Sequence, residues 1–160
     1  NGVINARGAM PPDHPGVRAR EGGKEFVLVE AERSGHGRDI VITRADIGEI
    51  QLAKGAMRAG LNILLQKAGV AASALDKIVI AGAFGNYIDV ESAVAIGMFP
   101  DLPRERFVQV GNAAGMGARL ALISREQRRL AAEIAAQAEY IELTSTPEFS
   151  DEFAMAMLLS

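Results

Sequence analysis

The stretch that decides the fold is "IVIAGAFGN", residues 78–86, in which an unbroken apolar run stops at two glycines. A run of Ile, Val, Ile and Ala without polar alternation predicts a buried β-strand in a sheet that is covered on both faces. Gly82 and Gly85 then predict a loop with few side chains. This loop is open to two interpretations: a tight turn that reverses the chain, or a ledge on which a flat ligand approaches the backbone.

Strands and helices alternate on both sides of this stretch. Residues 25–30 and 38–43 are rich in Val and Ile and flank a glycine-containing turn, which predicts an antiparallel hairpin. Residues 44–68 predict a long helix that begins at a capping box of Thr43 and Asp46 and ends at Gly69. After the glycine loop we expect a short helix capped by Asp89, a strand over 106–111 and a small-residue helix from 112. A helix over 125–138, a strand over 140–144 and a terminal helix opened by Thr146 and Pro147 are expected to follow. This order predicts an α/β fold with a mixed sheet and flanking helices.

The long helix contains three glycines, Gly48, Gly55 and Gly60. Each costs the helix about 1 kcal/mol relative to alanine. We therefore expect something to pack closely against this helix, either another helix or a ligand.

The composition argues against several classes of function. The chain has 160 residues and a formal charge of -3, with acidic and basic residues interspersed and 5% aromatics. Without a block of Lys or Arg, or aromatic side chains for base stacking, it predicts no nucleic-acid partner. The absence of cysteine excludes disulfides and cysteine-ligated metal clusters within these residues. His14 and His36 lie in turn-like stretches and are expected to be solvated, so no metal site is predicted.

The chain also carries no sign of membrane insertion. No apolar run reaches the ~20 residues of a membrane span and no signal peptide is visible, so we expect a cytoplasmic protein without membrane contact. Residues 1–24, rich in Gly, Pro and charge, predict an extended lead-in, and residues 25–160 predict one subdomain. Because the chain opens on "NGVINARGAM" without Met, we interpret it as a fragment of a longer protein.

Two strand-to-helix junctions, residues 82–86 and 111–117, are rich in glycine. The carboxyl ends of strands leave a crevice for ligands, and the free N–H groups of a helix start favour an anion or a polar ring edge. Neither junction matches the dinucleotide fingerprint or the P-loop. Asp89 and Glu91 are better explained as a helix cap and a first-turn acid, and Ser92 has no histidine near it, so we assign no catalytic residue. Any nucleotide would be held here through sugar and base.

The two junctions carry a family resemblance. "DKIVIAGAFGNYID" (76–89) and "VGNAAGMGARLAL" (110–122) resemble the adenosine motif and second connecting motif of the acetate and sugar kinase, heat-shock chaperone and actin superfamily. Gly82-Ala83 stands where that superfamily often has Gly-Gly. Together with the segments over 37–65, 95–103 and 139–143, the pattern is similar to the C-terminal region of the reductive activators of corrinoid proteins, over residues 20–158.

The resemblance implies both a fold and an activity. It implies the second half of an actin-like (ribonuclease H-like) ATPase module, with residues 25–160 as its C-terminal subdomain. The implied full-length parent is a ferredoxin-like, ATP-dependent redox activator that returns cob(II)amide to cob(I)amide in methyltransferase systems. It would use ATP with Mg and carry an iron–sulfur cluster in an N-terminal domain. The implied partners are a corrinoid protein or corrinoid methyltransferase and the parent's own N-terminal domains, and the fragment alone would be inactive.

The resemblance also implies roles for individual residues. The adenine and ribose side would be lined by Gly82, Ala83, Phe84, Gly85 and Asn86. Gln51, Lys54 and Arg58 lie three and four apart on one helix face, and would either contact the nucleotide or form a solvated stripe. Gly111 and Asn112, with Gly115 and Gly117, would form a turn and helix crossing between the two domains. Two alternatives stay open: another ATPase of the superfamily, such as a radical-dehydratase activator, or a non-catalytic interaction module whose glycine loops are only turns.

Overall fold

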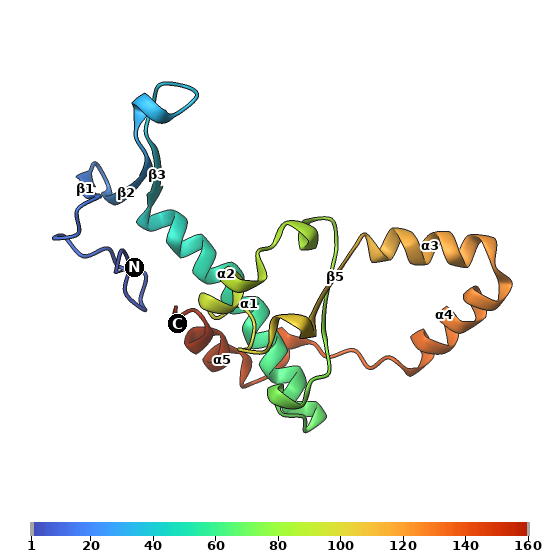
Figure 1. Ribbon diagram of the computed structural model, residues 1–160. Coiled ribbons are helices and arrows are strands. Elements are labelled where there is room, and N and C mark those ends of the chain that lie inside the picture. The colour runs from blue at the N-terminus through green and yellow to red at the C-terminus, as the bar shows by residue number, and fades with distance from the viewer. Residues whose placement is uncertain (1, 160) are drawn as a thin grey trace.

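The elements of the chain follow the predicted α/β order (Figure 1), and the computed structural model describes residues 2–159. The strands are β1 (Val17–Arg20), β2 (Gly23–Val29), β3 (Ile40–Thr43), β4 (Ile78–Ala81) and β5 (Phe107–Gly111). The α-helices are α1 (Arg44–Ala68), α2 (Val90–Ala95), α3 (Ala113–Ile123), α4 (Arg125–Gln137) and α5 (Phe149–Ala156). Short 3₁₀ turns are η1 (Ala31–Arg33), η2 (Ala72–Ala74), η3 (Phe84–Tyr87), η4 (Arg104–Arg106) and η5 (Leu143–Ser145). The α/β class is confirmed, and its antiparallel and parallel pairings lie in two separate sheets instead of one mixed sheet.

The first sheet is antiparallel, with the order β1-β2-β3. Its β2–β3 pair, with Phe26 opposite Ile42, confirms the predicted hairpin. Strand β1 lies inside the segment expected to be an extended lead-in, and its sequence "VRAR" has only four residues, two of them charged. The Arg18 side chain ties this strand to the hairpin through Glu25 and Asp39, each at 2.7 Å.

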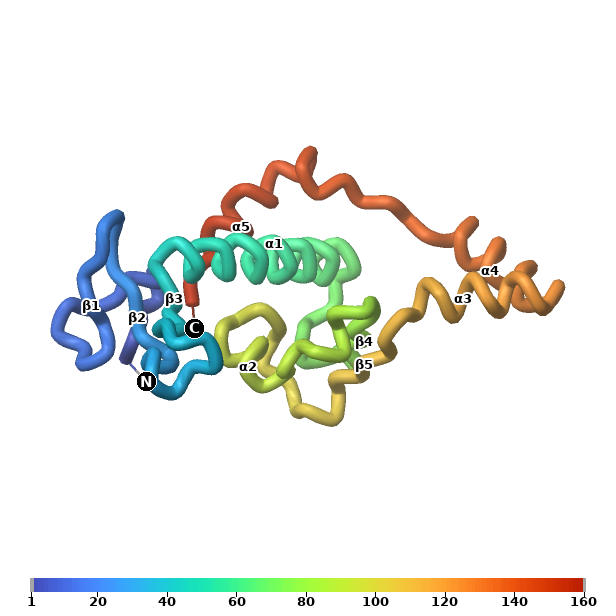
Figure 2. The backbone as a smooth tube through the Cα atoms, turned by 90° about the horizontal axis from the view of Figure 1, so that it is seen from above, coloured from blue at the N-terminus to red at the C-terminus, as the bar shows by residue number. Residues whose placement is uncertain are grey.

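Helix α1 begins and ends where its local signals predict. Thr43 and Asp46 form both bonds of the capping box, and Gly69 adopts a left-handed φ of 64°. Helix α5 lies alongside α1 (Figure 2). A Cβ on Gly55 would lie 3.0 Å from Met157 Cγ, and one on Gly60 would lie 3.3 Å from Leu143 Cδ1. The close neighbour predicted from the glycines is therefore the C-terminal part of this chain.

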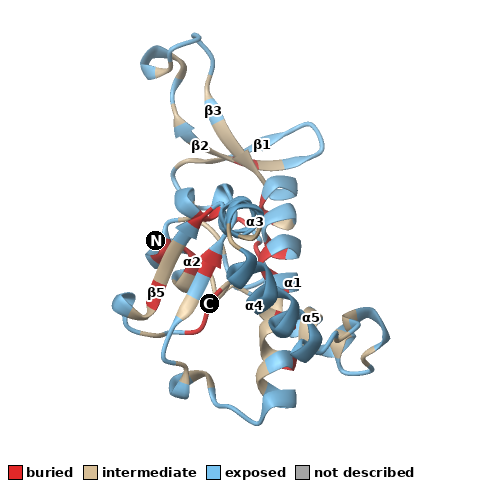
Figure 3. Ribbon diagram, turned by 90° about the vertical axis from the view of Figure 1, so that its right-hand side faces the viewer, coloured by how far each residue is buried: buried red, intermediate tan, exposed pale blue. Residues whose placement is uncertain are grey.

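The second sheet is the parallel pair β4–β5, with Ile80 opposite Gln109. Apolar residues from this pair, from α2 and from the turn after it form one buried cluster: Ile80, Val90, Ala93, Phe99 and Phe107. Figure 3 shows buried positions on β5, α1 and α2, whereas α3 and α4 are exposed. The other face of β4 is open within residues 2–159, since Val79 is 59% exposed, so the predicted cover on both faces is not met there.

Helices α3 and α4 project from the body as a helical hairpin (Figures 1 and 2). Asn112 and Ser124 cap them by accepting from Gly115 N at 2.9 Å and Gln127 N at 3.2 Å. The strand predicted over 140–144 is wrong: Glu142 instead accepts hydrogen bonds from the Thr144 N–H and hydroxyl, which closes the turn η5. The terminal helix begins at Phe149, after the predicted start.

Candidate functional site

The two glycine junctions lie side by side. Because β4 and β5 are parallel neighbours, their carboxyl ends share one edge of the sheet. The Gly82 N–H donates to the Gly111 carbonyl at 2.6 Å, which joins the two junctions directly. Gly111 has a left-handed φ of 61°, and a Cβ on it would lie 2.9 Å from Asn86 Nδ2, so a side chain here would displace that amide. Tertiary structure thus unites Gly82–Asn86 with Gly111 and Asn112 in one surface.

The two glycines of the first loop have different roles. Gly82 has a φ of 105° and nothing within 4 Å of where its Cβ would lie, so it leaves open space above the backbone. Gly85 is buried, and its Cβ would lie 3.0 Å from Ile80 Cγ2. Gly82 therefore fits the predicted ledge, whereas Gly85 lets η3 pack against β4.

Two aromatic side chains extend from this loop into solvent. Phe84 is 86% exposed and Tyr87 is 87% exposed. They stand three positions apart in a 3₁₀ turn, where residues i and i+3 lie over one another on the same side. Tyr87 is not among the site residues predicted from the sequence, although its position at the end of the glycine loop could have pointed to it. The loop thus offers open backbone at Gly82 beside two aromatic rings.

The site residues predicted on helix α1 have surroundings that differ from those of the glycine loop. Gln51 is 7% exposed and Lys54 is 1% exposed, because residues 157–159 lie over them. Gln51 Nε2 donates to the Met157 carbonyl at 3.0 Å, and the Lys54 ammonium group donates to the Leu158 carbonyl. Burial, with a smaller contribution from the charge of Arg58, lowers the pKa of Lys54. These two side chains hold the C-terminal segment against α1.

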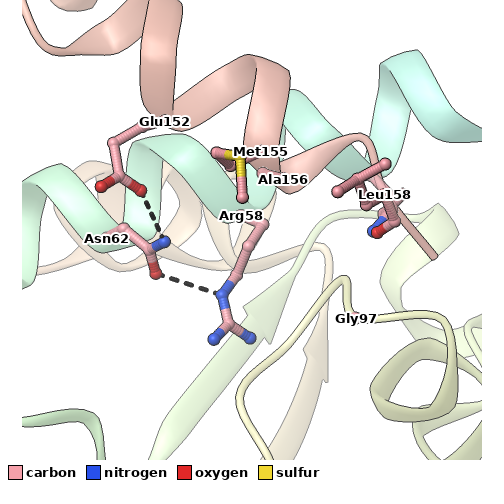
Figure 4. Close-up of a pocket in the computed structure, with 8 residues that line it drawn as sticks. Arg58, Asn62, Gly97, Glu152, Met155, Ala156 and Leu158 are labelled. Carbon is pink, nitrogen blue, oxygen red and sulfur yellow. Dashed lines mark hydrogen bonds between the residues drawn. The ribbon is translucent and has the colours of Figure 1, made fainter. Parts of the chain in front are cut away.

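Arg58 lies at a pocket of about 240 Å³ between α1, α5 and the turn that carries Gly97 (Figure 4). Its Nε donates to Asn62 Oδ1 at 3.1 Å, and Asn62 Nδ2 donates to Glu152 Oε2 at 2.9 Å. In Figure 4 the terminal nitrogens of Arg58 point away from α5. The residues that line this pocket do not include those of the glycine loop, so this pocket does not join the two predicted groups.

The histidines differ from one another. His36 is exposed, as expected, and its Nδ1 accepts from Arg38 N at 3.3 Å. His14 is half-buried and packs edge-on against the Phe26 ring at 5.5 Å, so the expectation that it is solvated is wrong. Within residues 2–159, no group of three or more His, Asp and Glu side chains could hold a metal ion. Over the same residues, no helix is long and apolar enough to span a bilayer.

Comparison with known proteins identifies the fold family. All of residues 1–160 match the family described as the C-terminal domain of RACo, the ASKHA domain. The corrinoid activation enzyme RamQ of Eubacterium limosum is 41% identical over 130 residues, which are 81% of this chain and 22% of that protein. A solved structure of a reductive activator for corrinoid, iron-sulfur protein is 39% identical, with a TM-score of 0.85 over 99% of this chain and 26% of that one.

This chain therefore spans about a quarter of the length of the relatives it matches. The resemblance noted in the sequence is confirmed by all three comparisons. The chain belongs to the family of RACo C-terminal domains, which have the ASKHA fold.

Proposed function

We propose that this chain forms the adenosine-binding side of the nucleotide site in an ATP-dependent reductive activator of corrinoid proteins. The observation that carries the proposal is the junction of the two glycine loops at one sheet edge, in a member of the RACo family. The names of both relatives support the activator role, since one is a corrinoid activation enzyme and the other a reductive activator.

Each part of the loop has a role in this proposal. Gly82 and Ala83 leave the backbone open to the base, and Phe84 and Tyr87 offer π-faces for stacking. Asn86 supplies an amide toward the ribose, and Gly111 leaves room for it. Asn112 caps α3 and so fixes the second junction. Gly85 packs on Ile80 and so lets the loop lie close to β4.

The three predicted residues of α1, namely Gln51, Lys54 and Arg58, have different parts in this proposal. Within residues 2–159 the terminal nitrogens of Arg58 make no hydrogen bond and point away from α5, so Arg58 remains a candidate contact. Gln51 and Lys54 would contact a nucleotide only after residues 157–159 left α1, since both are bonded to that segment.

The activity belongs to a longer protein, of which this chain is the C-terminal subdomain. Other parts of that protein would supply an iron–sulfur cluster and would hold Mg and the phosphates of ATP. ATP would drive the uphill transfer of one electron to cob(II)amide, which becomes cob(I)amide, in a corrinoid partner of a methyltransferase system, and a reductant acting through the cluster would supply that electron. It can do so only through different affinities for two states of the complex.

The test is calorimetric titration of the intact protein with ATP and ADP. We expect Gly82→Val to weaken ATP binding at least about tenfold, because a side chain there fills the open ledge and strains a positive φ. Gly22→Val is the matched control, since Gly22 has a φ of 88° and open surroundings in the β1–β2 turn. We expect Phe84→Ala to weaken binding about 5- to 100-fold if the base stacks there.

Each result separates the candidates. An intact protein that does not bind ATP would reject the nucleotide role and leave an interaction module whose exposed aromatics dock a protein. ATP binding that Gly82→Val and Phe84→Ala leave unchanged would place the nucleotide elsewhere. ATP-dependent appearance of the cob(I)amide absorbance in a corrinoid protein would distinguish the activator from an activator of a radical dehydratase.

A further inference from the structure

A single side chain on β5 supports the glycine loop from beneath. Gln109 lies on the same face of the strand as the buried core residue Phe107, because alternate residues of a strand share a face. A half-buried amide at such a position requires hydrogen-bond partners. Gln109 Nε2 donates to the Gly85 carbonyl at 2.6 Å and to the Ile88 carbonyl at 2.9 Å. These two acceptors lie within and just beyond η3, so one amide group ties both ends of the turn to the sheet.

The orientation of this amide is set by a second residue. Arg104 Nη2 donates to Gln109 Oε1 at 3.4 Å, and Arg104 Nη1 donates to the Phe107 carbonyl at 3.1 Å. Guanidinium nitrogens only donate and carbonyl oxygens only accept. A flipped Gln109 would therefore direct its oxygen at two carbonyl oxygens and its NH₂ group at a guanidinium. All the partners agree on one orientation, with both N–H bonds directed at the loop.

We propose that Gln109 is a positioning residue for the glycine loop, and that Arg104 acts through it. Gln109 sets the tilt of η3 over the sheet, and with it the direction in which Phe84 and Tyr87 face a ligand. The main-chain bond from Gly82 to Gly111 holds only the start of the loop. Without Gln109, the segment from Gly85 to Ile88 loses its side-chain link to β5. The identity of the ligand as an adenine nucleotide rests on the proposed function.

The test compares Gln109→Leu with the wild type in the intact protein. The leucine keeps most of the volume and removes both N–H donors. We expect ATP affinity to fall at least about tenfold, since two hydrogen bonds are lost from the loop. We also expect faster amide hydrogen exchange in peptides over 82–93, with exchange in the rest of the body unchanged. Gln137→Leu, at an exposed glutamine that ends α4, is the matched control and should change neither readout.

Arg104→Ala tests the second link. Because the proposal has Arg104 act on the loop through Gln109, we expect a smaller loss of affinity, and no added loss when Arg104→Ala is combined with Gln109→Leu. Additive losses would show that Arg104 acts independently and would overturn its part of the proposal.

The hydrogen-exchange measurement tests the positioning role of Gln109 independently of the proposed ATP binding. If the wild type binds ATP, unchanged affinity and unchanged exchange in Gln109→Leu would overturn the positioning role. A fall in affinity with faster exchange throughout the body and a lower midpoint would show a general structural role and would also overturn it. If the wild type does not bind ATP, the proposed function fails, and exchange over 82–93 alone decides whether Gln109 holds the loop.

Discussion

Lys54 is a buried cation that bonds to a main-chain oxygen of the C-terminal segment. Its spacing from Gln51 and Arg58 along α1 suits a polar stripe, and the sequence left open whether that stripe was solvated or met a ligand. The structure covers Gln51 and Lys54 with residues 157–159 and leaves Arg58 at the edge of a pocket. The spacing defines which residues share a face, but only the chain that packs against the face decides their environment.

Lys54 predicts a particular dependence of stability on pH. Its pKa in the folded protein lies below the ordinary value of 10.5, because burial disfavours the charged form. Between these two values the unfolded state binds more protons than the folded state, so the free energy of unfolding rises with pH in that window. We expect Lys54→Met, which removes the charge and keeps the length, to abolish this rise in denaturant titrations at increasing pH.

Lys67 provides the control for this experiment. It lies in the last turn of the same helix and is exposed, so Lys67→Met should keep the rise. A rise that survives in Lys54→Met would show that another group causes it. Faster proteolysis of the C-terminal segment in Lys54→Met would be a second sign that this lysine holds it.

Helix α1 shows what local signals determine at the scale of an element. Its bounds, Arg44 and Ala68, were predicted to the residue, because the capping box and the glycine stop act within a few residues of each end. The predicted strand over 140–144 failed for the opposite reason. A strand is completed by hydrogen bonds to a partner that its own sequence does not specify, and these residues have none within residues 2–159.

Two glycines of α1 predict opposite effects of the same substitution. Gly48→Ala should stabilise the protein by about 1 kcal/mol, because its Cβ would meet only the Arg44 side chain, at 3.5 Å. Gly55→Ala should destabilise it by about 1–3 kcal/mol despite the same gain in helix propensity, because its Cβ would lie 3.3 Å from Met157 N and 3.0 Å from Met157 Cγ. Denaturant unfolding measures both, and a stabilising Gly55→Ala would show that α5 does not pack closely on α1.

At the scale of the whole molecule, several large apolar side chains lie exposed on separate elements. Val79 on β4 is 59% exposed, and Leu122 and Ile123 at the end of α3 are 77% and 70% exposed. A single exposed apolar residue is common on any protein surface, whereas neighbouring ones such as Leu122 and Ile123 are typical of a surface that meets another part of a protein. Since the chain spans 22% and 26% of its relatives, we propose that other parts of a longer protein cover them.

This arrangement predicts how the isolated 160-residue chain behaves. Gly82, Phe84 and Tyr87 offer a ledge that is open to solvent, so the chain would bury only one side of a nucleotide. We expect weak or undetectable ATP binding by calorimetry and no phosphate release, with a circular dichroism spectrum that confirms folding. Robust ATP turnover by this chain alone would contradict the division of the site proposed above.

The sequence by itself determined the elements whose ends carry local signals, namely the β2–β3 hairpin, α1, the cap of α2 at Asp89 and the two glycine junctions. It also determined the family, because the motifs around those glycines are continuous in the chain. Only the tertiary structure decided that the junctions share one sheet edge, that Gln109 supports the loop, and that the C-terminal segment covers Lys54. The last of these joins residues 104 positions apart. Such contacts depend on how distant elements pack, and periodicity or capping within one segment carries no information about them.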